Sequence, residues 1–226
     1  MYLIVTRSFP PELGGMQSLM WGLSRELSKN FMIKVFADHI DNHKDFDDQA
    51  SFSIERVGGI KLLRKYRKAQ LINEFIKENK IQGIVGDHWK SFELIKTSKK
   101  KYCLIHSKEI NHPKGSSQNK RVLNVLNNVE KVIANSQYTK NLAIECGVNE
   151  NKIVVINCGV DLPKELNEKS LEKVESLLKV KTPRLITVSR FDKRKNHEKV
   201  VMALSCLLYT SPSPRDISGS RMPSSA

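Results

Sequence analysis

Short apolar runs alternate along the chain with segments whose apolar residues recur at steps of three and four. The runs predict β-strands, and the three-and-four spacing predicts amphipathic helices. We predict strands at residues 2–6, 31–37, 52–57, 81–87, 101–107, 131–135, 152–156 and 185–188. We predict helices at 15–28, after 68, near 92–97, at 122–129, at 136–146, within 163–182 and at 198–204. This alternation indicates an α/β fold, a Rossmann-like parallel sheet with helices on both faces.

A charged segment divides this alternation into two parts. Residues 163–182 are rich in Lys and Glu, and their apolar residues Leu171, Val174, Leu177 and Leu178 fall on one helical face. We interpret the segment as a connector that contains one short helix. It separates a complete Rossmann-like domain at 1–162 from residues 183–205, which hold the first strand, loop and helix of a second such domain.

The character of the sequence changes after Ser205. Residues 206–226 replace the helical pattern with Ser and Pro. A natural disordered tail is one interpretation of this composition. We favour another, in which the stretch from about Cys206 is the translation of a sequencing-library adapter and is excluded from fold reasoning. We then expect the natural protein to continue beyond Ser205, which makes this chain a truncated version.

Two glycines lie where the first predicted strand passes into the first predicted helix. Pro10 and Pro11 restrict the backbone at the entry to this loop, while Gly14 and Gly15 remove side chains where the backbone approaches another group closely. The free N–H groups and positive dipole at the start of the helix attract anions. The loop therefore suits a phosphate group, although a glycine pair also fits a tight turn without a ligand.

The chain is strongly basic. Its 226 residues carry a net charge of +14, and the pI is near 9.6. Nucleic acid, an anionic membrane surface and a polyanionic small molecule all suit such a charge. Aromatic residues make up only 7% of the chain and the cations are scattered, which argues against a nucleic-acid-binding module; we keep that module as an alternative.

Membrane spans, secretion and metal binding receive no support from the sequence. No apolar run is long enough to span a membrane, and the N-terminus lacks a basic segment followed by an apolar one, so we expect a cytoplasmic protein. The widely spaced Cys103, Cys146, Cys158 and Cys206 are expected to be reduced thiols. Cys103 and His106 have the spacing of metal ligands, but their neighbours predict a buried strand, so we expect no zinc site.

Residues 61–68 form the most basic run of the chain. They lead into a helix with Leu71, Ile72, Phe75 and Ile76 on one face. Basic residues beside apolar ones at helical spacing are typical of helices that lie on anionic membranes. A solvated helix face is the alternative, and we favour it.

Three sequence blocks, in this order, resemble the retaining GT-B glycosyltransferases of family 4. They are Phe9-Pro-Pro-Glu-Leu-Gly-Gly15, then Val132-Ile-Ala-Asn-Ser-Gln-Tyr-Thr139 through Gly159-Val160-Asp161, and finally Leu185-Ile-Thr-Val-Ser-Arg190-Phe-Asp-Lys-Arg-Lys195-Asn-His197. The resemblance implies two Rossmann-like domains with the active site in the cleft between them. It also implies transfer of a sugar from a nucleotide-diphosphate-sugar to an acceptor hydroxyl with retention of configuration, without a metal cofactor.

The resemblance assigns roles to five residues. Arg190 and Lys195 match the residues that bind the donor phosphates, where two cations would stabilise the leaving diphosphate. Gly14 and Gly15 match the glycine loop that approaches the donor phosphates and the reaction centre. His106 matches a catalytic histidine at a strand end, near the transferred sugar.

The sequence also departs from the family pattern. Ser107 stands where Gly or Asp is common, and Cys158 stands where Pro usually precedes Gly-Val-Asp. Nothing after Lys195 matches the glutamate pair that the second domain of such enzymes contributes to the nucleotide site. We therefore expect the parent protein to be a glycosyltransferase and this fragment to be inactive.

Other interpretations stay open beside the resemblance. Asp45-Phe46-Asp47 matches the carboxylate pair that holds a metal ion and a nucleotide sugar in another glycosyltransferase class, but its charged surroundings favour a solvated loop. A sugar-nucleotide epimerase of GT-B shape would also use the glycine loop, whereas the block at 185–197 favours a transferase. Cell-surface polysaccharide or glycolipid synthesis is a common setting for the family; a lipid-linked acceptor would make residues 61–68 a membrane contact.

Overall fold

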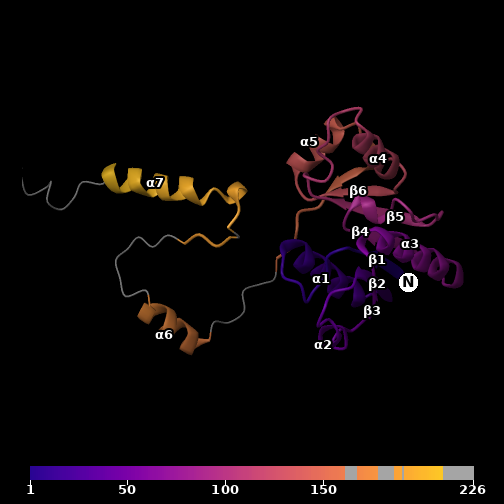
Figure 1. Ribbon diagram of the computed structural model, residues 1–226, viewed down its shortest axis with the longest axis horizontal. Coiled ribbons are helices and arrows are strands. Elements are labelled where there is room, and N and C mark those ends of the chain that lie inside the picture. The colour runs from indigo at the N-terminus through magenta and orange to yellow at the C-terminus, as the bar shows by residue number, and fades with distance from the viewer. Residues whose placement is uncertain (161–166, 178–185, 190, 211–226) are drawn as a thin grey trace, which may run out of the picture. The chain divides into compact units, whose positions relative to one another are not determined.

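The computed structural model describes residues 1–160, 167–177, 186–189 and 191–210 (Figure 1). The chain divides into two compact units, Met1–Leu162 and Pro163–Ala226. The first unit contains every strand of the described structure and is the part that builds a site.

The first unit is built on a seven-stranded sheet with the strand order β3-β2-β1-β4-β5-β6-β7 (Figure 1). Its strands are β1 (Tyr2–Val5), β2 (Ile33–Asp38), β3 (Ser53–Val57), β4 (Gly83–Gly86), β5 (Lys100–Ile105), β6 (Lys131–Ala134) and β7 (Ile153–Val155). All six pairings are parallel, as the sequence predicts. The order reverses between β1 and β4, which makes this pair the topological switch point of the sheet.

Helices cover both faces of this sheet. The helical elements are α1 (Gly15–Ser28), α2 (Lys44–Asp47), α3 (Lys61–Glu78), η1 (Trp89–Ser91), α4 (Ser117–Leu126), α5 (Gln137–Glu145) and η2 (Glu150–Lys152). Successive strand residues point to opposite faces. Leu3 and Val5 pack in one core cluster with residues of α3, α4 and α5, while Ile4 packs in the other with residues of α1 and α2. The predicted Rossmann-like layers are therefore confirmed.

The capping chemistry explains where the later helices begin. Ser116 accepts a hydrogen bond from the backbone N–H of Asn119 at the start of α4, and Ser136 accepts one from Thr139 at the start of α5. Gly147, just after α5, has a φ of 102°, a conformation that favours glycine and stops the helix. The helix predicted at 136–146 is confirmed, and Ser136 and Gly147 set its two ends.

Two local predictions are wrong. Residues 92–94 form a turn and 95–97 form no regular element, instead of the predicted helix. Trp89, Phe92 and Ile95 are buried here, and the Asn73 side chain binds backbone groups of this short segment. The solvated loop expected at Asp45-Phe46-Asp47 forms part of a helical turn, α2. The centre of its Phe46 ring lies 4.8 Å from the centre of the Trp21 ring on α1. This apolar contact holds the turn and could not be inferred from the charged residues around Phe46.

The second unit contains α6 (Glu168–Leu177), η3 (Lys193–Lys195) and α7 (His197–Thr210). The helix predicted within the connector is present, whereas residues 186–188 of the strand predicted at 185–188 are not in a strand. The described part of this unit contains no strand with which residues 186–188 could form a sheet. The adapter origin of residues 206–226 stays a prediction: α7 continues through Cys206, and residues 211–226 lie outside the described structure.

Candidate functional site

The candidate site lies at the carboxyl edge of the sheet, where β1 and β4 end. Ligands of open α/β sheets bind outside the carboxyl ends of the strands at such a switch point. Thr6 and Arg7 follow β1, and Asp87 and His88 follow β4. The two strand ends therefore place hydroxyl, guanidinium, carboxylate and imidazole groups beside one another.

Asp87 organises this edge. The Thr6 hydroxyl and the Arg7 backbone N–H donate to its Oδ2 at 2.7 and 3.1 Å, and the Ser91 hydroxyl donates to its Oδ1 at 2.9 Å. Asp87 is only 4% exposed, so these three donors replace the water that a carboxylate normally binds. The arrangement fixes the backbone at Arg7 and the η1 turn relative to each other.

The glycine loop that follows Arg7 is open to solvent. Gly14 is the N-cap of α1 and contributes no side-chain cap, and both Gly14 and Gly15 are exposed. A Cβ added to Gly15 would meet no described atom within 4 Å outside its own helix and chain neighbours. A Cβ added to Gly14, in contrast, would lie 2.3 Å from Oε1 of Gln17, so that side chain packs against the start of the helix. The phosphate-binding role of the loop stays a prediction.

A buried ion pair anchors the entry to this loop. The Arg56 guanidinium on β3 donates to the carbonyl of Pro10 and lies 2.6 Å from the carboxylate of Asp47, and its side chain is 3% exposed. His43 Nδ1 also lies 2.8 Å from that carboxylate. The solvated loop expected at Asp45-Phe46-Asp47 is therefore wrong for Asp47, which pairs with a guanidinium; Asp45 is exposed. The sequence pattern did not indicate that Arg56 supports the glycine loop.

His106 follows β5 and so belongs to the same edge of the sheet. Its backbone N–H donates to the Glu109 carboxylate, and its Nε2 atom is buried without a hydrogen-bond partner in the described structure. The next residue, Ser107, has a φ of 84°, in the region that favours glycine. This conformation accounts for the Gly that is common at this position, and the serine found here adopts it although it is unfavourable for a residue with a side chain. The role of His106 itself stays a prediction.

His88 is a second histidine at this edge, which the sequence analysis did not select. Its Nδ1 accepts a hydrogen bond from the Lys90 backbone N–H at 3.0 Å. Burial, followed by the positive charges of Arg7 and Lys90 and by His106 and His112, lowers the pKa of His88 to about 3. His88 is therefore neutral at pH 7. It lies two residues after the end of β4, much as His106 follows the end of β5, and this position near a strand end is the signal that sequence reasoning had available.

A cavity of about 490 Å³ opens beside these groups. Its lining combines Arg7 and Asp38 from the strand ends, Arg64, Lys65, Lys68, Ala69 and Ile72 from α3, Lys90, Ser91, Glu93 and Leu94 from the segment after β4, and Arg121 from α4. Lys68 is 6% exposed and reaches Asp38 at 2.5 Å and the Thr6 carbonyl at 2.8 Å. Arg64, Lys65 and Lys68 of the basic run at 61–68 thus line this cavity.

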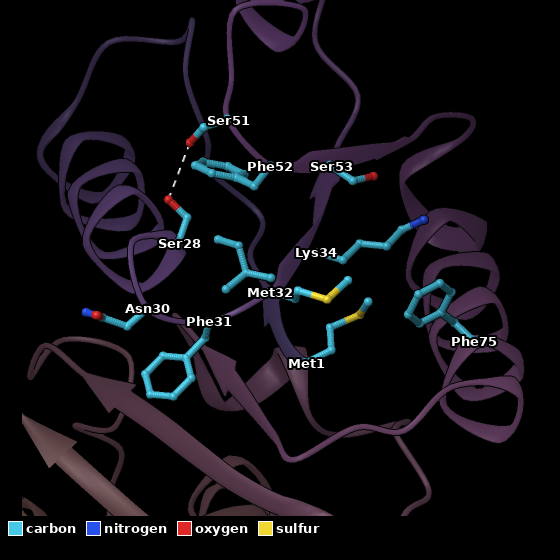
Figure 2. A pocket seen from close by; sticks show the side chains of 11 residues that line it. Met1, Ser28, Asn30, Phe31, Met32, Lys34, Ser51, Phe52, Ser53 and Phe75 are labelled. Atoms are coloured by element: carbon cyan, nitrogen blue, oxygen red, sulfur yellow. Dashed lines mark hydrogen bonds between the residues drawn. The ribbon is translucent and has the colours of Figure 1, made fainter.

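A second cavity, of about 610 Å³, lies at the opposite edge of the sheet, where β2 and β3 begin (Figure 2). Met1, Met32, Phe52 and Phe75 line it, and the ammonium of Lys34 lies 4.6 Å from the centre of the Phe75 ring. This mainly apolar cavity is remote from the carboxyl strand ends and contains none of the predicted site residues.

The two predicted cations belong to the second unit. Lys195 ends η3, and its backbone N–H donates to the Asp192 carbonyl at 2.8 Å. Arg190 lies outside the described residues. The structure therefore brings Gly14, Gly15 and His106 to one edge of the first unit. The donor-phosphate roles of Gly14, Gly15, Arg190 and Lys195 and the catalytic role of His106 stay predictions.

Two further observations concern membrane and metal. No helix in the described part of the chain is long and apolar enough to cross a membrane. Over the same residues, no cluster of three or more His, Cys, Asp or Glu side chains is arranged to hold a metal ion. Cys103, Cys146 and Cys158 are free thiols, as expected, and burial raises the pKa of Cys103 well above its ordinary value.

Solved structures with a similar fold include GT-B glycosyltransferases and also a UDP-N-acetylglucosamine 2-epimerase from Rickettsia bellii, which is 8% identical with a TM-score of 0.50, over 79% of this chain and 47% of that one. The glycosyltransferase from Rickettsia africae is 22% identical with a TM-score of 0.70, over 92% of this chain and 58% of that one. Sucrose-phosphate synthase from Thermosynechococcus elongatus is 15% identical with a TM-score of 0.69, over 91% and 60%. HepE of Anabaena in complex with UDP is 17% identical with a TM-score of 0.59, over 79% and 50%.

The family follows from the sequence match. The model described as Glycosyltransferase Family 4 matches residues 13–164, and the chain therefore belongs to that family. Among curated proteins, no sequence matches this chain. The chain spans about half to three-fifths of the length of the solved structures named above.

Proposed function

We propose that the parent protein transfers a sugar from a nucleotide-diphosphate-sugar to an acceptor hydroxyl, with retention of configuration. The family match over residues 13–164 carries this proposal, and it favours a transferase over an epimerase or a nucleic-acid-binding module. The open glycine loop beside the switch point supports it, because this is where a sheet of this topology binds phosphate-bearing ligands.

In this proposal the donor phosphates lie against Gly14 and Gly15, and His106, whose buried Nε2 atom has no partner among the described residues, lies near the transferred sugar. Arg190 and Lys195 of the second unit neutralise the charge that develops on the β-phosphate as the glycosidic bond breaks. Cations placed where charge develops lower the barrier most, so no metal cofactor is required.

The parent protein is the right material for a test of transfer. We expect the gene to continue beyond the codon for Ser205 and the present fragment to be inactive. Re-sequencing with different adapters supplies the longer gene, and release of nucleoside diphosphate from donor sugars measures activity. UDP-glucose is the first donor to try, because HepE has been solved with it.

Point variants of the parent protein then test the assigned roles. His106→Ala, Arg190→Ala and Lys195→Ala should each lower the rate by about 100-fold or more, since each removes a transition-state contact. Lys77→Ala, at an exposed position of α3, is the matched control and should keep the rate. Activity that survives in all three site variants would contradict the assignment.

We also propose contact with the inner face of the cytoplasmic membrane through the first half of α3, in cell-surface polysaccharide or glycolipid synthesis. Ile60, Leu63 and Tyr66 recur every three residues and are 71%, 63% and 55% exposed, and Lys65 and Arg67 are exposed beside them. Apolar and basic side chains together are typical of interfacial helices. Lys68 is excluded from this surface because it is buried on Asp38.

Vesicle sedimentation tests the membrane contact. Leu63→Asp with Lys65→Glu and Arg67→Glu should abolish binding to phosphatidylglycerol–phosphatidylcholine vesicles. Lys77→Glu with Lys99→Glu, at exposed positions away from the Ile60–Leu63–Tyr66 stripe, should weaken it only slightly. Equal loss in both variants would show that net charge alone attracts the vesicle.

A further inference from the structure

The cavity beside the switch point carries an excess of positive charge. Six cationic side chains line it, against two carboxylates, those of Asp38 and Glu93. Asp38 pairs with both Lys68 and Arg64, at 2.5 and 3.3 Å, and Glu93 pairs with Arg121 at 2.6 Å. Both acidic side chains of the lining are therefore already engaged.

Three lining cations have no carboxylate partner among the described residues. Arg7, Lys65 and Lys90 are exposed at the cavity and enter none of the ion pairs of the structure. Like charges that surround one space repel one another, and an anion bound between them relieves that repulsion. His88 lies at the same edge and adds no charge of its own at pH 7, because burial and then Arg7 and Lys90 lower its pKa to about 3.

The floor of the cavity also offers a buried donor. The Lys68 ammonium has three N–H groups, of which two point to Asp38 and to the Thr6 carbonyl. The third has no acceptor among the described residues. A buried charge that shares its only carboxylate with Arg64 is weakly neutralised, and a second anion at this position would complete its coordination.

The shape and the remaining walls restrict the ligand to a small molecule. The volume of about 490 Å³ lies in the range of small-molecule sites. Ala69, Ile72 and Leu94 add an apolar wall that suits the carbon part of such a ligand. A phosphate matches the cationic part better than a carboxylate, because its charge of nearly −2 and its several oxygens can engage Arg and Lys together.

We propose that this cavity binds the phosphate group of a phosphorylated small molecule, and that this molecule is the acceptor of the sugar. The first half of the proposal rests on the cavity alone, and the second half rests on the proposed function. The phosphate can belong to a soluble sugar phosphate or to a lipid headgroup, which present the same group to Arg7, Lys68 and Lys90.

Binding is measured on the 226-residue chain by two-dimensional ¹H–¹⁵N NMR at constant ionic strength. Glucose 6-phosphate is the probe and glucose is its neutral counterpart. We expect saturable shifts of the Lys68, Lys90 and Ser91 amide signals with glucose 6-phosphate and none with glucose. Shifts confined to Gly14 and Gly15 would overturn the proposal, because they would place the phosphate on the glycine loop instead.

A matched pair of double variants separates the cavity from net charge. Arg7→Gln with Lys90→Gln should weaken binding of glucose 6-phosphate at least tenfold. Lys77→Gln with Lys99→Gln removes the same charge outside the cavity and should change binding by less than twofold. All four side chains are exposed, so both variants should keep the fold. Equal weakening in the two double variants would overturn the proposal.

Vesicles of phosphatidic acid in phosphatidylcholine distinguish the two sources of the phosphate. If the vesicles bind only when Arg7 and Lys90 are intact and glucose 6-phosphate does not bind, the ligand is a lipid phosphate. Binding of glucose 6-phosphate identifies a soluble ligand, and binding of neither probe overturns the proposal. Failure of the parent protein to transfer sugar, with cavity binding intact, would remove the proposed function and the acceptor role but keep the phosphate site.

Discussion

The Thr6 hydroxyl donates a 2.7 Å hydrogen bond to the carboxylate of Asp87, and this bond joins the ends of β1 and β4 at the switch point of the sheet. On one side of it lie Arg7 and the glycine loop, and on the other lie His88 and the η1 turn. The glycine loop and the phosphate cavity therefore share one buried carboxylate as their structural support.

Removal of that carboxylate should destabilise the first unit. Asp87→Ala leaves three donors without their acceptor and should lower the free energy of unfolding by about 3 kcal/mol. Asp87→Asn should cost less, because the Ser91 hydroxyl can rotate to accept a hydrogen bond from the new amide. Urea denaturation measures both values. A cost below about 1 kcal/mol for Asp87→Ala would show that water replaces the carboxylate at this edge.

The ion pair that anchors the glycine loop makes a second prediction. Arg56→Met leaves the Asp47 carboxylate largely buried without its cation, which should cost about 3–5 kcal/mol. Hydrogen exchange at Leu13 to Gly15 should also become faster, because the Pro10 carbonyl loses its anchor. Lys29→Met, in an exposed pair with Glu26, is the control and should change stability by less than about 0.5 kcal/mol. Similar costs in both variants would contradict the buried role of Arg56.

His88 predicts a specific dependence of stability on pH. Its pKa is about 3 in the folded chain and near 6.5 when unfolded, so the unfolded chain binds more protons between these values. The stability that neutral His88 contributes is complete above pH 6.5 and is lost as the pH falls toward 3. Between pH 7 and pH 5.5 this loss should be about 1 kcal/mol.

His88→Asn isolates this effect. An asparagine at this position can accept the same backbone hydrogen bond, as Asn149 does from Asn151 at the start of η2, but it does not titrate. Unfolding by urea at pH 7 and pH 5.5 should show a smaller loss of stability in the variant than in the parent chain. An identical loss in the two proteins would mean that His88 becomes protonated without cost in the folded state.

Gly86 in β4 is predicted to be restricted by packing. A Cβ at this position would lie 2.5 Å from the buried ring of Phe92, so Gly86→Ala should cost about 1–3 kcal/mol. Gly22→Ala, within α1, meets no described atom within 4 Å outside its own helix and should stabilise the chain by about 0.5–1 kcal/mol. Thermal denaturation compares the two. Stabilisation by both substitutions would show that the Phe92 ring moves freely.

The regular part of the fold could be predicted because its signals are local. Apolar period and capping residues place β1, α1 and α5 within a few residues, as at Ser136 and Gly147. The segment at 92–97 could not be predicted in this way. Its conformation depends on Asn73, some twenty residues earlier, whose side chain binds the backbone at Leu94 and Lys96.

Only the site residues that follow predicted strands could be identified from the sequence. Gly14, Gly15 and His106 follow strands, and the structure places them at the carboxyl edge. Asp47 and Arg56 carried no such signal, because their pairing depends on how α2 folds back onto β3. Lys68 belongs to a basic run whose pattern is typical of a solvated or membrane-facing helix. In the tertiary structure, however, Lys68 is buried and forms an ion pair with Asp38.

The order of the strands has a consequence for synthesis of the protein. Tyr2 pairs with Gly83 and Val5 with Gly86. About eighty further residues must therefore be synthesised after β1 before β4, its second neighbour in the sheet, leaves the ribosome. Pairings between distant segments form slowly, because the intervening loop must first be closed. The nascent chain therefore assembles β1, β2 and β3 before the glycine loop and Asp87 can meet. Until β4 emerges, the apolar strand β1 has one open side, and this interval is when the growing chain is most exposed to aggregation.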